Sequence, residues 1–160
     1  VLYGSSVGVT AEGNQIWHQD SSGVRDASED YDSFGWSLTA GDFDSDGYVD
    51  LAVSAPGEGV YGKALAGAVN VLYGSRVGIT AERDQFWHQD SFSSLETLWS
   101  TTKCASNHIE DSCDEADRFG WSLTAGDFDG DGHADLAIGV DGEAISGEDQ
   151  AGAVNVLYGN

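Results

Sequence analysis

Positive charge is scarce in this chain of 160 residues, in which six lysines and arginines stand against 28 aspartates and glutamates. The formal net charge of −22 at pH 7 repels phosphate groups, which argues against nucleic acids and anionic membrane surfaces as partners. The chain also has no methionine and no apolar run of membrane-spanning length. We therefore expect no nucleic-acid binding and no insertion into a membrane.

Cysteine is also sparse. Cys104 and Cys113 lie in one polar segment, with eight residues between them. A metal site built on this pair is disfavoured, because there is no second cysteine pair and the nearest histidine, His108, stands alone. We predict that the two cysteines form a disulfide that closes a short loop.

Acidic residues are concentrated in two nine-residue segments, Asp42-Phe-Asp-Ser-Asp-Gly-Tyr-Val-Asp50 and Asp127-Phe-Asp-Gly-Asp-Gly-His-Ala-Asp135. Calcium takes six to eight oxygen ligands at about 2.3–2.6 Å, and alternate residues of a tight loop can point inward together. The glycine after the third aspartate allows the positive φ of a sharp turn. The predicted ligands are the side chains of Asp42, Asp44, Asp46 and Asp50 with the carbonyl of Tyr48, and the side chains of Asp127, Asp129, Asp131 and Asp135 with the carbonyl of His133.

These loops differ from an EF-hand, which has a glutamate at position 12 and lies between helices. Here position 12 is Val53 or Ile138, and short runs rich in β-branched residues flank each loop, which is typical of strands. The alternative is an acidic Asp-Gly hairpin turn that binds no metal. Four carboxylates at ligand spacing favour one calcium ion per loop, two per chain.

The sequence repeats itself. Residues 34–44 are identical to residues 119–129, and residues 67–74 are identical to residues 152–159. The elements Val-Leu-Tyr-Gly and Trp-His-Gln-Asp also recur. We divide the chain into a unit at 1–74 and a unit at 75–160, the second with an insert at 91–118.

Each unit is expected to contain four short strands, which in the first copy lie at about 34–43, 48–54, 68–73 and 85–89. An all-β period of four strands with recurrent glycine and tryptophan indicates a β-propeller blade with antiparallel strands. We expect the two units to be part of one propeller.

With these motifs, the chain resembles the FG-GAP repeat family, found in the propeller of integrin α-subunits. Phe34-Gly35 and Phe119-Gly120 match the FG element, and Ala55-Pro56-Gly57, followed by Gly67-Ala68, stands in the place of the GAP element. The second copy departs from the family at Val140-Asp-Gly. The resemblance implies calcium between the first and second strands of each blade, and a role in ligand recognition or adhesion. Calcium loops and a disulfide both point to a location outside the cytosol, secreted or at the cell surface.

Three functions are compatible with these features. The first is a scaffold or adhesion module that recognises an unknown protein or glycan, the second is a structural repeat rigidified by calcium, and the third is a part of a secreted hydrolase. Gly4-Ser-Ser-Val-Gly8 matches a hydrolase nucleophile elbow, but the next copy has Arg76 in place of the serine and no helix signal follows. We therefore expect no enzymatic activity.

The number of blades bears on the oligomeric state that we expect. A propeller closes with roughly four to eight blades, whereas this chain supplies two. The last unit lacks a fourth strand, which residues 15–19 of another copy can provide. We expect a homo-oligomer, a trimer or a tetramer, with a longer chain holding further repeats as the alternative. The chain begins in the middle of an element, as expected of a trimmed or incomplete chain.

Overall fold

The computed structural model describes residues 1–89 and 114–159, and its regular elements there are nine β-strands. No helix in these two stretches is long and apolar enough to span a membrane. The strands are β1 (Tyr3–Ser5), β2 (Gly8–Thr10), β3 (Leu38–Gly41), β4 (Asp50–Ala55), β5 (Ala68–Tyr73), β6 (Thr80–Trp87), β7 (Phe119–Gly126), β8 (Asp135–Val140) and β9 (Ala153–Leu157).

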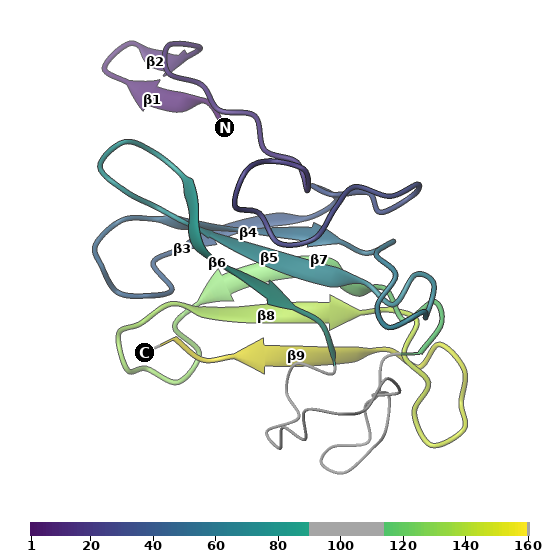
Figure 1. Ribbon diagram of the computed structural model, residues 1–160. Helices are drawn as coiled ribbons and strands as arrows, with labels where there is room; N and C mark the ends of the chain where they lie inside the picture. Colours follow the sequence, from purple (N-terminus) through teal and green to yellow (C-terminus); the bar gives the residue numbers. More distant parts are fainter. Residues whose placement is uncertain (90–113, 160) are drawn as a thin grey trace.

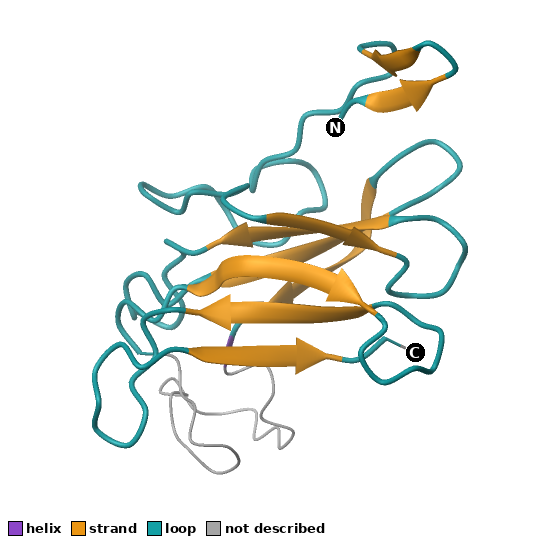
Figure 2. Cartoon of the chain, turned by 180° about the vertical axis from the view of Figure 1, so that it is seen from behind, coloured by secondary structure: helices purple, strands orange, loops and turns teal. Residues whose placement is uncertain are grey.

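The strands form one hairpin and two sheets, and all their pairings are antiparallel. Strands β3-β4-β5-β6 make the first sheet, strands β7-β8-β9 make the second sheet, and β1-β2 make the hairpin. The two sheets are stacked face to face, and the hairpin stands away from both at the N-terminal end (Figure 1). The view from behind shows the same separation (Figure 2).

Apolar side chains between the two sheets form the main core. Val69 and Val71 of β5 pack with Phe119 of β7 and with Ile138 and Val140 of β8, and all five are buried. A smaller cluster covers the opposite side of the first sheet, where partly buried residues of the N-terminal segment pack on Val53 and Leu72. The alternation of apolar residues along the strands therefore serves to join neighbouring sheets.

The four-strand unit is confirmed in the first copy, although some strand limits differ from the expected ones. Strand β3 covers only Leu38–Gly41 of the expected 34–43, while the identical sequence of the second copy forms the longer strand Phe119–Gly126. The longer strand lies against the first sheet, where Phe119 N donates to Ala66 O at 2.8 Å. Strand β6 begins at Thr80, earlier than the expected 85.

Candidate metal centres

Two loops that join the first two strands of each sheet carry the predicted calcium ligands. In the first loop, one carboxylate oxygen from each of Asp42, Asp44 and Asp50 lies within 4.8 Å of the others. Asp127, Asp129 and Asp135 make the same arrangement in the second loop. These six residues come together as the sequence predicts.

Backbone amides hold the first loop in shape. Asp42 accepts hydrogen bonds from Asp46 N at 3.1 Å and from Gly47 N at 3.0 Å. Asp50 accepts from Phe43 N at 2.7 Å and from Gly74 N at 2.8 Å, so its carboxylate joins the loop to the end of β5. Gly47 has φ of 88°, which its place in the turn requires.

The second loop repeats these contacts with almost the same lengths. Asp127 accepts from Gly132 N at 3.0 Å, and Asp135 accepts from Phe128 N at 2.6 Å and from Gly159 N at 2.9 Å. Gly132 has φ of 94°. Two loops with different residues at three positions therefore adopt one geometry.

The carboxylates of the first loop fit a hard cation. Asp44 Oδ1 is buried and has no hydrogen-bond partner, a costly state for a carboxylate oxygen unless another group contacts it. Asp50 is fully buried, and burial, with the nearby charges of Asp44 and Asp42, raises its pKa, while amide hydrogen bonds act in the opposite direction. A calcium ion would satisfy the free oxygen and offset the repulsion among the three side chains.

Asp46 and Asp131 lie outside the two groups of three carboxylates. Asp46 Oδ1 accepts from Tyr48 N, and Asp131 Oδ1 accepts from His133 N, both at 2.8 Å. Both aspartates therefore shape the turn, and their role as ligands stays a prediction, as do the carbonyl ligands.

A groove of about 440 Å³ separates the two loops. Asp42 and Ser45 line one side, and Asp127 and His133 line the other. The side chains of Ser45 and His133 are joined by a hydrogen bond between Oγ and Nδ1, which links the first sheet's loop to the second's. The two loops therefore lie side by side, on opposite sides of this groove.

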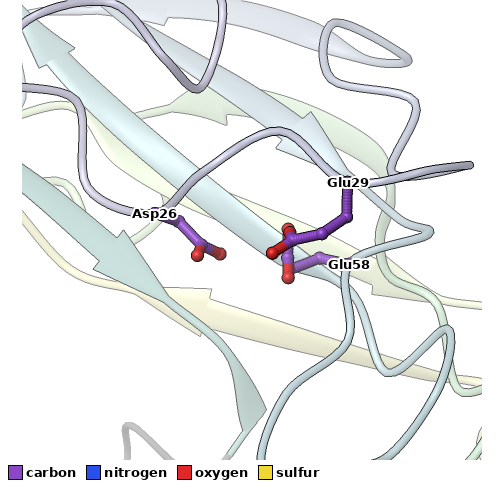
Figure 3. A group of neighbouring side chains, drawn as sticks. All are labelled: Asp26, Glu29 and Glu58. Atoms are coloured by element: carbon purple, nitrogen blue, oxygen red, sulfur yellow. The ribbon is translucent and has the colours of Figure 1, made fainter.

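Sequence reasoning missed a third group of carboxylates. Asp26, Glu29 and Glu58 place one oxygen each within 4.8 Å of one another, and Figure 3 shows the three carboxyl groups turned toward a common point. Burial, and then the charges of Asp26 and Asp32, raise the pKa of Glu58 to about 8. At neutral pH this cluster therefore retains a proton.

One signal in the sequence identifies this cluster. Asp26, Glu29 and Glu58 recur 85 residues later as Asp111, Asp114 and Glu143. This repetition is hard to recognise because its residues lie far apart along the chain, whereas the carboxylates of each acidic loop lie within nine residues.

The repeats match one family model, described as the FG-GAP repeat, at residues 34–72 and 119–157. The chain contains two FG-GAP repeats. The first sheet is thus one FG-GAP blade, and the second sheet contains the first three strands of another.

Curated relatives share these repeats. Phosphatidylinositol-glycan-specific phospholipase D of Bos taurus is 30% identical over 130 residues, covering 81% of this chain and 14% of the relative. Integrin alpha-PS2 of Drosophila melanogaster is 33% identical over 132 residues, covering 79% of this chain and 8% of the relative. The chain therefore spans only a small part of the relatives' length. The predicted disulfide of Cys104 and Cys113 lies outside the described residues.

Proposed function

We propose that the chain is a calcium-binding FG-GAP propeller module that holds one calcium ion in each acidic loop. The observation that carries this proposal is the meeting of three carboxylates in each loop, with a buried and unpartnered oxygen on Asp44. A calcium ion accepts oxygen ligands only and tolerates irregular geometry, which suits this donor set. In the first loop, Asp42, Asp44 and Asp50 would hold it.

The ion would stabilise the junction of the first two strands in each blade. Asp50 already joins the loop to β5 through Gly74 N, so a cation bound to its carboxylate would link three consecutive strands. Loops of modest affinity fill where free calcium is high, so we place the module outside the cytosol, secreted or at the cell surface.

We propose that the module recognises a protein or glycan ligand and is not itself an enzyme. The similarity to an integrin α-subunit supports an adhesion role. A second candidate function, as the accessory part of a secreted hydrolase, is favoured by the phospholipase D relatives, although the match covers only 14% of the bovine protein. The third candidate function is that of a purely structural repeat.

Calorimetric titration of chelator-treated protein with calcium tests the metal proposal. We expect two ions per chain for the wild type and one ion for either Asp42→Asn or Asp127→Asn. Asp149→Asn, which changes an exposed aspartate outside both loops, is the control and should bind two. No heat of calcium binding, together with a melting temperature that chelator leaves unchanged, would refute the proposal.

A glycan array and a pull-down with immobilised extracellular-matrix proteins, each run with calcium and with chelator, separate the functional candidates. Calcium-dependent capture of a defined glycan or protein supports recognition. Turnover of a phosphatidylinositol glycan or of a polysaccharide by the wild type, lost on substituting one carboxylate, would instead identify an enzyme.

A further inference from the structure

The two acidic loops touch each other at positions where their sequences differ. Of the nine residues in each loop, six are identical and three are not. The exchanged pairs are Ser45 with Gly130, Tyr48 with His133, and Val49 with Ala134. Three of these residues, Ser45, His133 and Ala134, lie at the boundary between the loops. The boundary therefore joins unlike partners, a hydroxyl group from the first loop and an imidazole from the second.

The polar part of this boundary is the hydrogen bond between Ser45 Oγ and His133 Nδ1. Ser45 lies between two predicted ligands, Asp44 and Asp46, and its φ of 58° is a left-handed conformation that costs a non-glycine residue free energy. The carbonyl of His133 is itself a predicted ligand of the second loop. Fixing these two side chains against each other therefore restricts the backbone that presents ligands in both loops.

The loops also meet through closely packed backbone. A Cβ placed on Gly41 would lie 3.0 Å from the Cβ of Ala134, so the glycine leaves the room that the alanine occupies. Gly41 directly precedes Asp42, and Ala134 directly precedes Asp135. The first predicted ligand of one loop and the last predicted ligand of the other are therefore attached to the same contact.

Ordering one loop should make it easier to order the other. Each loop holds four aspartates within nine residues, and without a cation their mutual repulsion opposes the conformation that brings them together. An ion in the first loop would offset that repulsion and hold Ser45 in place. The second loop would then lose less conformational freedom when it binds its own ion, because one of its contacts is already formed.

We propose that the two acidic loops bind calcium cooperatively, and that the contact between Ser45 and His133 transmits the effect from one loop to the other. The coupling is reciprocal, since each ion raises the affinity of the protein for the other ion by the same factor. This inference rests on the calcium binding of the proposed function. It adds that the two sites act as one unit, filled together over a narrower range of calcium concentration than two independent sites.

The sign of the coupling identifies its origin. Two calcium ions repel each other, and at about 0.15 M salt, where the screening length is about 8 Å, this repulsion is weakened but not removed. Direct electrostatics therefore makes the second ion bind less tightly than it would alone. A coupling factor above one must come from the structural contact between the loops.

Calorimetric titration of the chelator-treated full chain with calcium measures the coupling factor. The affinity of each site alone is measured with the other site disabled, by Asp127→Asn for the first loop and by Asp42→Asn for the second. The factor is the product of the two stepwise association constants of the wild type, divided by the product of the two single-site constants. We expect a factor of about five, at the lower end of the range for allosteric coupling.

Two substitutions remove the contact by introducing the residue that the other loop has at the same position. Ser45→Gly and His133→Tyr should each reduce the coupling factor to about one. Glycine accepts the φ of 58° at position 45, so Ser45→Gly is compatible with the loop. Because the factor is determined within each background, a change in the affinity of one site does not alter it. His18→Tyr makes the same exchange at an exposed residue outside both loops, and this control should keep the wild-type factor.

Amide hydrogen exchange gives a second readout that does not depend on affinity. In Asp129→Asn, calcium should fill only the first loop, while Gly132 N can still donate to Asp127 Oδ2 in the second loop. We expect calcium to slow the exchange of the Gly132 and His133 amides of this variant by about threefold or more. Adding Ser45→Gly to the same variant should abolish the slowing.

Any of three results would overturn the inference. The first is a wild-type coupling factor of one or below, and the second is a factor that either Ser45→Gly or His133→Tyr leaves unchanged. The third is amide exchange in the second loop that does not respond to calcium in the first. In each case the protein still binds calcium, so the coupling fails while the proposed function stands. If no calcium binds at all, the proposed function fails and this inference fails with it.

Discussion

Gln19 Nε2 lies 2.7 Å from Glu58 Oε2, and the two side chains are only 2% and 3% exposed. The pair joins the Trp-His-Gln-Asp element to the loop that follows the second strand of the next blade. Gln89 and Glu143 repeat the contact one blade later at 2.5 Å. A buried amide that donates to a buried carboxyl group is therefore a recurrent connection between consecutive blades.

Glu58 should make the stability of the protein depend on pH. Its pKa is raised from 4.5 to about 8, so between these values the native state binds more protons than the unfolded state. The free energy of unfolding must then fall as pH rises through this window, by at most about 1.4 kcal/mol per unit. Glu58→Gln keeps an acceptor for Gln19 and removes the titration, so its melting temperature should decline less between pH 5 and pH 8.

The comparison is made by calorimetry at saturating calcium. Glu82→Gln is the matched control. Because Glu82 is exposed, its substitution should leave the pH dependence of the melting temperature the same as in the wild type. If the melting temperatures of the wild type and of Glu58→Gln change equally with pH, Glu58 is ionised throughout this range.

The grouping of carboxylates in the two acidic loops could be predicted from sequence because the residues lie close together along the chain. Spacing alone brings Asp42, Asp44 and Asp50 together, and the same spacing holds in the second loop. The cluster at Glu58 could not be found in the same way. Its members come from two segments that only the folded chain brings together, one before β3 and one after β4.

The length of the strands could not be predicted from local sequence either. Residues 34–44 and 119–129 are identical, yet the first copy yields a strand of four residues and the second a strand of eight. Phe119 is fully buried against the first sheet, whereas Phe34 has no such sheet beside it among the described residues. The repeat pattern thus predicts where strands occur, and packing against a neighbour determines how far they extend.

The two acidic loops should differ in calcium affinity because, among the described residues, the first loop has an arginine paired with one of its carboxylates and the second has no such pair. Arg83 Nη2 lies 2.8 Å from Asp44 Oδ2, and it competes with calcium for that aspartate. Removing the charge with Arg83→Gln should strengthen one of the two sites by a few fold, since the arginine side chain is 66% exposed and such pairs contribute about 0.2–1 kcal/mol.

Competition titration with a fluorescent chelator resolves the two sites. Arg76→Gln makes the same change of net charge at an exposed position. If it increases calcium affinity as much as Arg83→Gln does, the increase comes from net charge and not from the loss of the ion pair with Asp44. Combining Arg83→Gln with Asp127→Asn should leave the strengthened site, which assigns it to the first loop.

Cys104 and Cys113 are expected to form a disulfide that closes a loop of about ten residues, which would contribute about 2–3 kcal/mol by the loop-entropy estimate. Because so short a ring constrains only its own segment, reduction should leave the melting of the two sheets nearly unchanged. Mass spectrometry of alkylated, non-reduced protein should find no free thiol, and two modified cysteines would contradict the bond.

Gly57 should be irreplaceable for a steric reason that does not apply to its neighbour Gly59. A Cβ at Gly57 would lie 1.9 Å from the carbonyl oxygen of Tyr31, whereas a Cβ at Gly59 meets nothing closer than Lys63 O at 3.7 Å. Gly57 N also donates to Asp32 O at 3.0 Å, so the two backbone segments cannot separate without losing that bond. Gly57→Ala should therefore lower the free energy of unfolding by about 1–3 kcal/mol or more, and Gly59→Ala by much less. Urea denaturation of both variants measures the difference, and equal midpoints would mean that the segment at Tyr31 moves aside without cost.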